Sequence, residues 1–130
     1  MDFIAIPTVR KIYISHPLRG TGPLTYLEIE ANRRKVDEIC ARISQQEPNV
    51  LPLSPIHAFS FLSALGPQDR ALRHCLELLE LADEVWVYGD YKSSEGCILE
   101  IAHARSLDIP VFFEGSSAIA GTFAELETAS

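Results

Sequence analysis

The stretch that decides the fold covers residues 85–100 and reads VWVYGDYKSSEGCILE. Its first four residues are apolar or aromatic, which predicts a buried strand, and the residues after Ser94 have helical spacing. The glycine and serines between them predict a turn. A strand, a turn and a helix N-terminus together form an anion site, because the N–H groups of the first helical turn have no partner within the helix. Glu100 is expected about one to two turns inside this helix, beside that site.

The rest of the chain repeats this alternation of strand and helix. We predict strands at residues 11–15, 50–53, 84–88 and 109–113, helices at roughly residues 24–46, 68–82, 94–107 and 122–127, and a loop at residues 54–61. Strands that alternate with helices across short turns imply parallel strands with right-handed crossovers. The predicted fold is α/β: a single domain over residues 1–130, with a small doubly wound parallel sheet of four to five strands flanked by helices, flavodoxin-like or Rossmann-like.

The predicted fold also locates a binding crevice. In such sheets, ligands bind at the carboxyl ends of the strands, near the point where the strand order reverses. We therefore expect three loops around one crevice: those after Ser15, after Leu53 and after Tyr88.

Composition and charge narrow the partners. The net charge of −7 argues against polymeric nucleic acid, which requires clustered Lys and Arg, but does not exclude a single nucleotide. Residues 1–7 have neither a basic segment nor a long apolar core, so we expect no signal peptide, no membrane span and a cytoplasmic location. Cys40, Cys75 and Cys97 lack metal-ligand spacing; we expect free thiols, no metal and no cofactor.

Two loops carry residues suited to phosphate. The guanidinium of Arg19 fits bidentate phosphate recognition and Gly20 allows close backbone approach, although a solvated loop arginine is the alternative. Ser94 is expected to cap the helix, and capping alone would explain it. Gly96 is costly at an early helical position, which indicates close approach of a ligand or of another backbone.

The titratable residues near the crevice have open interpretations. Glu100 falls roughly 60° from the apolar stripe of Cys97, Ile101 and Ala104, so it either is a surface residue or points along the rim of the sheet. His16 and His57 either contact a ligand or are structural. Asp90 binds sugar hydroxyls, passes a proton, or only forms the turn.

Three segments carry a resemblance to a known family. They are IYIS at residues 12–15 followed by Leu18-Arg19-Gly20, LLELADEVWV at residues 78–87, and Ser94-x-Gly96-x-x-x-Glu100 with Ala102, Ala104 and residues 109–111. Together they resemble the nucleoside 2-deoxyribosyltransferase superfamily, above all its small bacterial and phage members and the deoxynucleoside 5′-monophosphate N-glycosidases.

The resemblance implies a role for each matching residue. Glu100 would attack the anomeric carbon of a (deoxy)ribosyl group, Tyr13 would orient it, and Ser15, Arg19 and Ser94 would hold a 5′-phosphate. Together with the crevice residues above, this gives Glu100, Tyr13 and Asp90 as the predicted catalytic residues. The predicted substrate-binding residues are Ser15, His16, Arg19, Gly20, His57, Ser94 and Gly96. A homo-oligomer, dimer or higher, is also implied, with Phe59, Phe61 and Phe123 as exposed aromatic candidates.

The chain departs from the family pattern at two places. Cys75 stands where characterised members have an aspartate that helps to deliver a proton to the departing base, and a thiol in an apolar face is a poor substitute. Asp90 and His57 are candidates for this role, although the spacing demands neither. His16 and Pro17 replace the glycine and serine of the N-glycosidase loop.

Two functions therefore remain open from the sequence. The first is cleavage or transfer of the N-glycosidic bond of a small-molecule nucleoside or nucleotide, with Glu100 as nucleophile. The second is a non-catalytic nucleotide-binding module of the same fold, which the missing aspartate favours.

Overall fold

The computed structural model of the protein describes residues 9–19, 26–114, 118–119 and 122–123. The described elements, in chain order, are β1 (Arg10–Ser15), α1 (Tyr26–Gln46), β2 (Val50–Leu53), α2 (Pro55–Ala58), α3 (Asp69–Leu79), β3 (Glu84–Val87), the short 3-10 helix η1 (Tyr91–Ser93), α4 (Glu95–Ser106), β4 (Val111–Phe113), β5 (Ala118–Ile119) and β6 (Thr122–Phe123).

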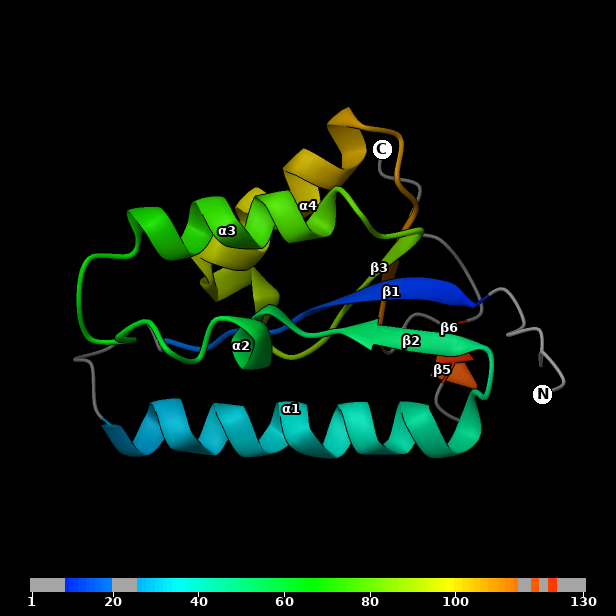
Figure 1. The fold of residues 1–130 in the computed structure, drawn as a ribbon, viewed down its shortest axis with the longest axis horizontal. Helices are drawn as coiled ribbons and strands as arrows, with labels where there is room; N and C mark the ends of the chain where they lie inside the picture. Colours follow the sequence, from blue (N-terminus) through cyan, green and yellow to red (C-terminus); the bar gives the residue numbers. More distant parts are fainter. Residues whose placement is uncertain (1–8, 20–25, 115–117, 120–121, 124–130) are drawn as a thin grey trace, which may run out of the picture.

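The predicted α/β fold is confirmed. Strands β1 to β4 form a four-stranded, all-parallel sheet in the order β2-β1-β3-β4. Figure 1 shows α1 against one face of this sheet and α3 and α4 against the other, so helices cover both faces of the sheet. The chain moves from β1 to β2 on one side and to β3 on the other, so the strand order reverses between β1 and β3, where ligands are expected in such folds.

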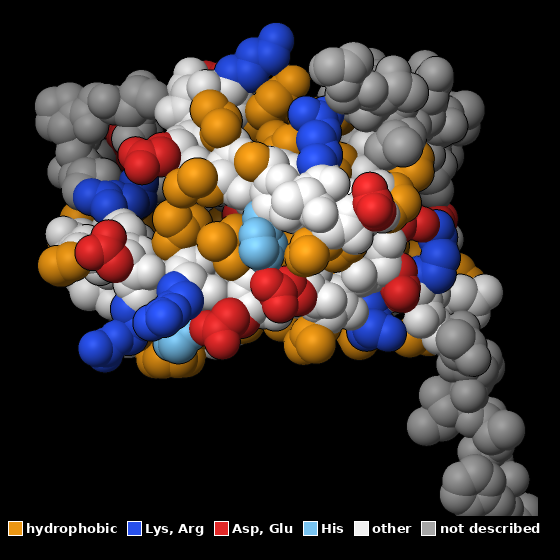
Figure 2. Space-filling model, turned by 90° about the horizontal axis from the view of Figure 1, so that it is seen from above, with side chains coloured by type: hydrophobic (Ala, Val, Ile, Leu, Met, Phe, Trp, Pro, Cys, Tyr) orange, Lys and Arg blue, Asp and Glu red, His pale blue; other side chains and the backbone are white. Residues whose placement is uncertain are grey.

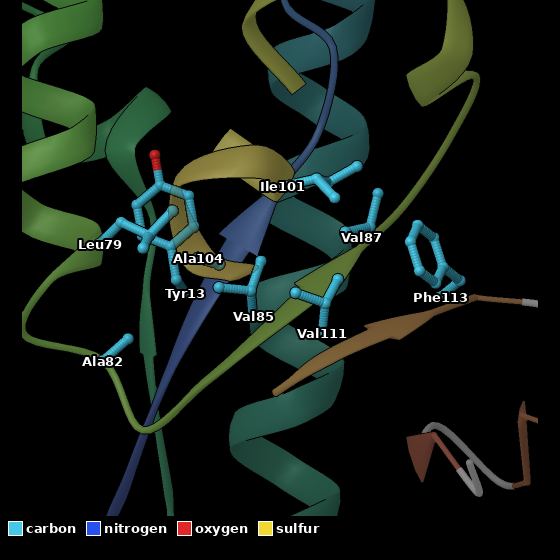
Figure 3. Close-up of a cluster of buried hydrophobic side chains, with 9 residues drawn as sticks. All are labelled: Tyr13, Leu79, Ala82, Val85, Val87, Ile101, Ala104, Val111 and Phe113. Atoms are coloured by element: carbon cyan, nitrogen blue, oxygen red, sulfur yellow. The ribbon is translucent and has the colours of Figure 1, made fainter. Parts of the chain in front are cut away.

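Alternation along the central strands builds a separate core on each face of the sheet. Ile12, Ile14 and Trp86 belong to the cluster that α1 covers with Val36 and Ile39. The alternate residues of these strands, Tyr13, Val85 and Val87, face α3 and α4. They belong to a second cluster, drawn in Figure 3, which consists of Tyr13, Leu79, Ala82, Val85, Val87, Ile101, Ala104, Val111 and Phe113. The two-sided burial explains why residues 85–88 form a continuous apolar run in the sequence.

Two elements begin or end at other residues than the sequence predicts, one because of a long-range contact and one because of a proline. α3 ends at Leu79 and not at residue 82, because the N–H of Asp83 already bonds to the carbonyl of Lys11 and the chain must turn onto the sheet. The carboxylate of Asp83 also accepts from the N–H of Lys11, at 2.7 Å. β4 begins at Val111 and not at residue 109, since Pro110 has no N–H to donate to a strand.

Two further predictions of secondary structure were wrong. Residues 54–61 are not all loop: Ser54 caps the short helix α2 by accepting from the N–H of His57, and Pro55 stands at its start. Thr122–Phe123 is strand β6, paired antiparallel with β5, and not the start of a helix. β-branched and aromatic residues favour extended backbone, which the helical prediction underweighted. Residues 124–127 of that predicted helix lie outside the described residues.

On the α3 and α4 side of the molecule, the charged surface of the described residues shows no large patch of a single sign (Figure 2). In Figure 2, basic and acidic side chains are interspersed on that face. No helix among the described residues is both long and apolar enough to cross a membrane.

Candidate active site

Helix α4 brings Glu100 under the carboxyl end of β1. Ser94 caps the helix by accepting from the N–H of Cys97 at 3.2 Å. The predicted stripe of Cys97, Ile101 and Ala104 is buried against the sheet. Glu100 is buried with it and is only 6% exposed, so it is neither a surface residue nor free on the rim.

Two hydroxyl groups from β1 hold the carboxylate of Glu100. The Tyr13 hydroxyl donates to Oε2, and the Ser15 hydroxyl donates to Oε1 at 2.8 Å. Tyr13 and Ser15 are two residues apart on one strand and therefore share the face that α4 covers. Figure 3 shows the Tyr13 ring within the apolar cluster beside Leu79, with its hydroxyl directed away from Val85 and Val111.

Burial sets the charge state of this group. It raises the pKa of Glu100 to about 7, while the hydrogen bonds from Tyr13 and Ser15 act in the opposite direction. Burial, with the neighbouring Glu100 charge, also raises the pKa of Cys75 to about 12 and that of Tyr13 well above its usual value. Near neutral pH, Glu100 is therefore the group that titrates, and its neighbours keep their protons.

Glu100 lies in the wall of a cavity of about 680 Å³ that opens beyond the strand ends. This volume falls in the range of small-molecule sites, about 300–1,000 Å³. One part of the wall is apolar and consists of Pro55, Ile56, Phe59, Leu62, Ala64, Ala71 and Leu72. The polar part contains His16, Arg19, Arg33, Ser63, Gln68, Asp69, Cys75, Ser93, Ser94, Glu95 and Glu100, with Leu18 and Gly96 completing the wall.

The three loops predicted to surround one crevice do meet at this cavity. The loop after β1 contributes His16 and Arg19, the segment after β2 contributes Ile56 and Phe59, and the segment after β3 contributes Ser94. Gly96 also lines it. Tyr13 and Ser15 lie behind Glu100, fully buried, so the hydroxyl of Ser15 serves the carboxylate and is not presented to a phosphate as predicted. Gly20 lies outside the described residues.

His57, predicted to bind substrate, does not line this cavity. Its Nε2 contacts the carboxylate of Asp37 on α1, and its Nδ1 lies 2.6 Å from the Ser54 hydroxyl. Helix α2 causes this, because it turns the side chain of His57 toward α1, where it lines a separate hollow with Cys40 and Leu78.

Asp90 is also absent from the wall that holds Glu100. It lines a second cavity, of about 410 Å³, on the α1 side, together with Lys35 and Arg42. The chain turns at Gly89, whose φ of +74° is a conformation that suits glycine, and this turn carries Asp90 away from Glu100. His16, Arg19 and Ser93 line both cavities and separate them.

The side chain of His16 is fixed at this boundary. A Cβ on Gly89 would lie only 3.3 Å from its Nε2, and its Nδ1 lies 2.6 Å from the carbonyl oxygen of Pro17. Burial lowers the pKa of His16, with the charge of Lys35 acting in the same direction. The hydrogen bond to Pro17 acts in the opposite direction on this pKa without reversing the shift.

Gly96 is not required by packing between protein segments. A Cβ built there would meet only the Ser94 hydroxyl, at an ordinary 3.9 Å. Of the two explanations for this glycine, close approach of another backbone is excluded among the described residues. The space above it belongs to the cavity.

Three charged residues of the cavity were missed by sequence reasoning: Arg33, Asp69 and Glu95. Asp69 and Glu95 begin α3 and α4, and acidic residues in a first helical turn are common for purely local reasons. Their shared position at the carboxyl edge of the sheet was the available signal. Arg33 lies in the middle of a long charged helix, and nothing in its sequence neighbourhood distinguishes it from Arg34.

Within the described ranges, no group of three or more His, Cys, Asp or Glu side chains is arranged to hold a metal ion. The ionisable side chains that line the cavity are a buried carboxylate, two guanidinium groups, an imidazole, a thiol and two exposed carboxylates.

The fold places the protein in a structural class with known members. A conserved protein from Enterococcus faecalis V583 matches with a TM-score of 0.60 and 18% identity, over 82% of this chain and 63% of that one. A 2-deoxyribosyltransferase from Bacillus psychrosaccharolyticus matches with a TM-score of 0.53 and 18% identity, over 79% of this chain and 70% of that one. The aligned part thus spans less than two thirds of the first of these proteins, and the likeness shows the fold: α/β, like that of a deoxyribosyltransferase.

The sequence itself assigns the family. Residues 10–114 match DUF7768, described as a domain of unknown function, and the chain belongs to this family. No curated protein matches the chain.

Proposed function

We propose that this protein cleaves or transfers the N-glycosidic bond of a nucleoside or nucleotide, with Glu100 as the nucleophile. The observation that carries the proposal is the pairing of the two buried polar side chains among the described residues: Ser15 and Glu100 bond to each other, with Tyr13 on the second carboxylate oxygen. A buried carboxylate is costly, and here it faces a cavity of ligand size at the strand ends.

The chemistry follows from this arrangement. A carboxylate oxygen of Glu100 forms a bond to the anomeric carbon while the carbon–nitrogen bond breaks, and the base leaves with the bonding electron pair through an oxocarbenium-like transition state. The resulting glycosyl ester is then attacked by water or by a second base, which releases Glu100. Tyr13 and Ser15 hold the carboxylate at a fixed orientation during both steps.

The departing base also needs a proton. Cys75 lines the cavity, but with a pKa of about 12 it is a poor donor. Asp69 and Glu95 are the carboxyl groups that line the same cavity besides Glu100. We assign proton delivery to this pair, in place of Asp90 and His57.

The test is release of free base, followed by chromatography, from a panel of nucleosides and 5′-monophosphates. Wild type should release base and Glu100→Gln should be at least about 10³-fold slower, since it has no nucleophile. Glu77→Gln is the matched control, because Glu77 is an exposed carboxylate on α3 that lies outside the cavity. Equal turnover by wild type and Glu100→Gln would contradict the proposal.

A non-catalytic nucleotide-binding module is the second function, and Cys75 in the place of an acidic group favours it. This function predicts that no substrate of the panel is turned over, while some nucleotides raise the melting temperature of wild type and of Glu100→Gln alike. Both the catalytic and the binding-only function are compatible with a homo-oligomer in which a neighbouring copy completes the cavity. Size-exclusion chromatography with light scattering tests it.

A further inference from the structure

Arg33 is the unexplained charged residue of the cavity. It lies on α1, its side chain is 26% exposed, and it lines the same cavity as Glu100. Its Nε atom is buried without a hydrogen-bond partner, the one such side-chain atom among the residues that the structure describes. Buried donors are nearly always paired in folded proteins, so an unpaired one calls for a specific reason.

The position of its one ion pair shows which edge of the guanidinium is available. Nη1 donates to Glu30 at 3.1 Å, one turn earlier on the helix. The opposite edge carries the Nε–H and an Nη2–H side by side, and the Nε–H has no acceptor among the described residues. Two parallel donors of this kind match two oxygens of one phosphate group.

A second guanidinium lies on the same part of the wall. Arg19 lines the cavity from the loop after β1 and has no ion pair with any described residue. The side chain of Asn32 ties this loop to α1, because it donates to the carbonyl oxygen of Leu18 at 2.9 Å. The residues that flank this bond in sequence are Arg19 and Arg33, so it holds the segments carrying them together.

The carboxylates of the cavity come from other elements. Asp69 belongs to α3, and Glu95 and Glu100 belong to α4. The cavity therefore has cationic groups from the loop after β1 and from α1, and anionic groups from α3 and α4. An anionic group on a ligand is attracted to the first set and repelled by the second, while Glu100 remains opposed to the part of the ligand that reacts.

We propose that Arg33, together with Arg19, binds a phosphate group of the substrate, so that the substrate is a nucleotide and not a free nucleoside. This inference rests on the function proposed above and identifies Arg33 as a residue that determines specificity. It is separate from the catalytic step, since Arg33 would contact a part of the substrate that does not react.

The test compares two neighbouring arginines. Arg33→Met removes the donor edge, Arg33→Lys keeps the charge without the paired donors, and Arg34→Met is the matched control, because Arg34 is exposed on the same helix and lines neither cavity. For each protein, kcat/KM is measured with a nucleoside and with its 5′-monophosphate, and affinity for both is measured by calorimetry.

We expect wild type to prefer the monophosphate. Arg33→Met should lower kcat/KM for the monophosphate about 10- to 100-fold, Arg33→Lys should recover only part of this, and neither should change the value for the nucleoside. Arg34→Met should behave as wild type. A preference of wild type for the free nucleoside, an equal loss on both substrates with Arg33→Met, or no loss at all would overturn the inference.

The two proposals fail separately. If base is released but Arg33→Met is indistinguishable from wild type, phosphate recognition by Arg33 is refuted and the N-glycosidic activity stands. If no base is released, yet calorimetry shows that the monophosphate binds and that Arg33→Met weakens it, the catalytic proposal is refuted and the phosphate site stands. Inorganic phosphate serves as the third probe, and equal binding of phosphate and nucleotide would show an anion site unrelated to the substrate, against the inference.

Discussion

The two faces of the sheet are built from the same strands and differ in what they tolerate. On the α1 face, β1 and β3 present Ile12, Ile14 and Trp86 to an apolar helix stripe. On the α4 face, the intervening residues of β1 are Tyr13 and Ser15, and they meet the carboxylate of Glu100. On the α1 face, burial of apolar groups stabilises the fold. On the α4 face, burial of the ionised Glu100 carboxylate away from water is unfavourable and offsets part of that stabilisation.

This difference indicates which face serves stability and which serves chemistry. A polar cluster buried at the end of a strand is retained only if it is fully hydrogen-bonded or useful. Here both carboxylate oxygens have donors, and the cluster borders the cavity at the reversal of strand order. Substitution of a buried apolar residue on the α1 face should therefore lower the stability of the fold, whereas removal of the buried charge on the α4 face should raise it.

The largest effect on stability is expected on the apolar face. Ile14 is fully buried under α1, so Ile14→Ala should lower the free energy of unfolding by about 3 kcal/mol, through lost burial and the cavity left behind. Urea denaturation measures this. Ile98→Ala is the control, since Ile98 is 49% exposed, and it should change stability by less than about 0.5 kcal/mol. Similar losses in both variants would contradict the division between the faces.

On the polar face, removing the charge should stabilise the protein. Because the pKa of Glu100 is raised to about 7 in the folded state, the folded protein binds more protons than the unfolded chain between pH 4.5 and 7. The contribution of Glu100 to stability is therefore complete below pH 4.5 and is lost as pH rises through 7. Glu100→Gln should abolish this loss and be more stable than wild type at pH 8, by on the order of 2 kcal/mol.

Melting temperatures of wild type and Glu100→Gln across pH 4 to 9 give the measurement. The difference between the two proteins cancels the other titrating groups, His16 included. It should grow with pH up to about 7 and then remain constant. A difference that is independent of pH would show that Glu100 titrates at its ordinary value.

A smaller effect is expected from the hydroxyl that holds the carboxylate. Tyr13→Phe keeps the ring in the core but removes a donor to the ionised form of Glu100, so the pKa of Glu100 should rise. If Glu100 acts as nucleophile, the rise of kcat/KM with pH should move to higher pH by about one unit. Tyr26→Phe serves as control, because Tyr26 is 63% exposed, and an unshifted profile in Tyr13→Phe would argue against the assigned role.

The smallest effect tests the glycine above the cavity. Gly96→Ala has room for its methyl group and removes the entropic cost of glycine in a helix, so it should stabilise the free protein by up to about 1 kcal/mol. The same methyl group enters the space where a ligand would approach the helix. Nucleotide affinity, measured by calorimetry, should therefore fall while the melting temperature rises, and unchanged affinity would remove Gly96 from the binding surface.

Much of the fold was predictable because the signals are local. The buried run before Gly89, the helical stripe of Cys97, Ile101 and Ala104, and the strand at residues 50–53 each follow from spacing within one segment. Where prediction failed, either a tertiary contact or an overlooked local cap decided the result. Asp83 ends α3 early by bonding to β1, and the Ser54 cap with Pro55 creates a short helix where the composition indicated a loop.

The features of the candidate site also separate into those that the sequence determines and those that depend on tertiary contacts. The sequence by itself determined that Glu100 lies early in the helix after β3, that Tyr13 and Ser15 share a face of β1, and that three loops meet at one edge, since period and topology are properties of the chain. Only the tertiary structure decided that Glu100 is buried between those two hydroxyls, that Asp90 and His57 turn away, and that Arg33 and Asp69 enter the cavity. Burial and pairing depend on side chains that arrive from elements distant in sequence, and these set the charge of the carboxylate.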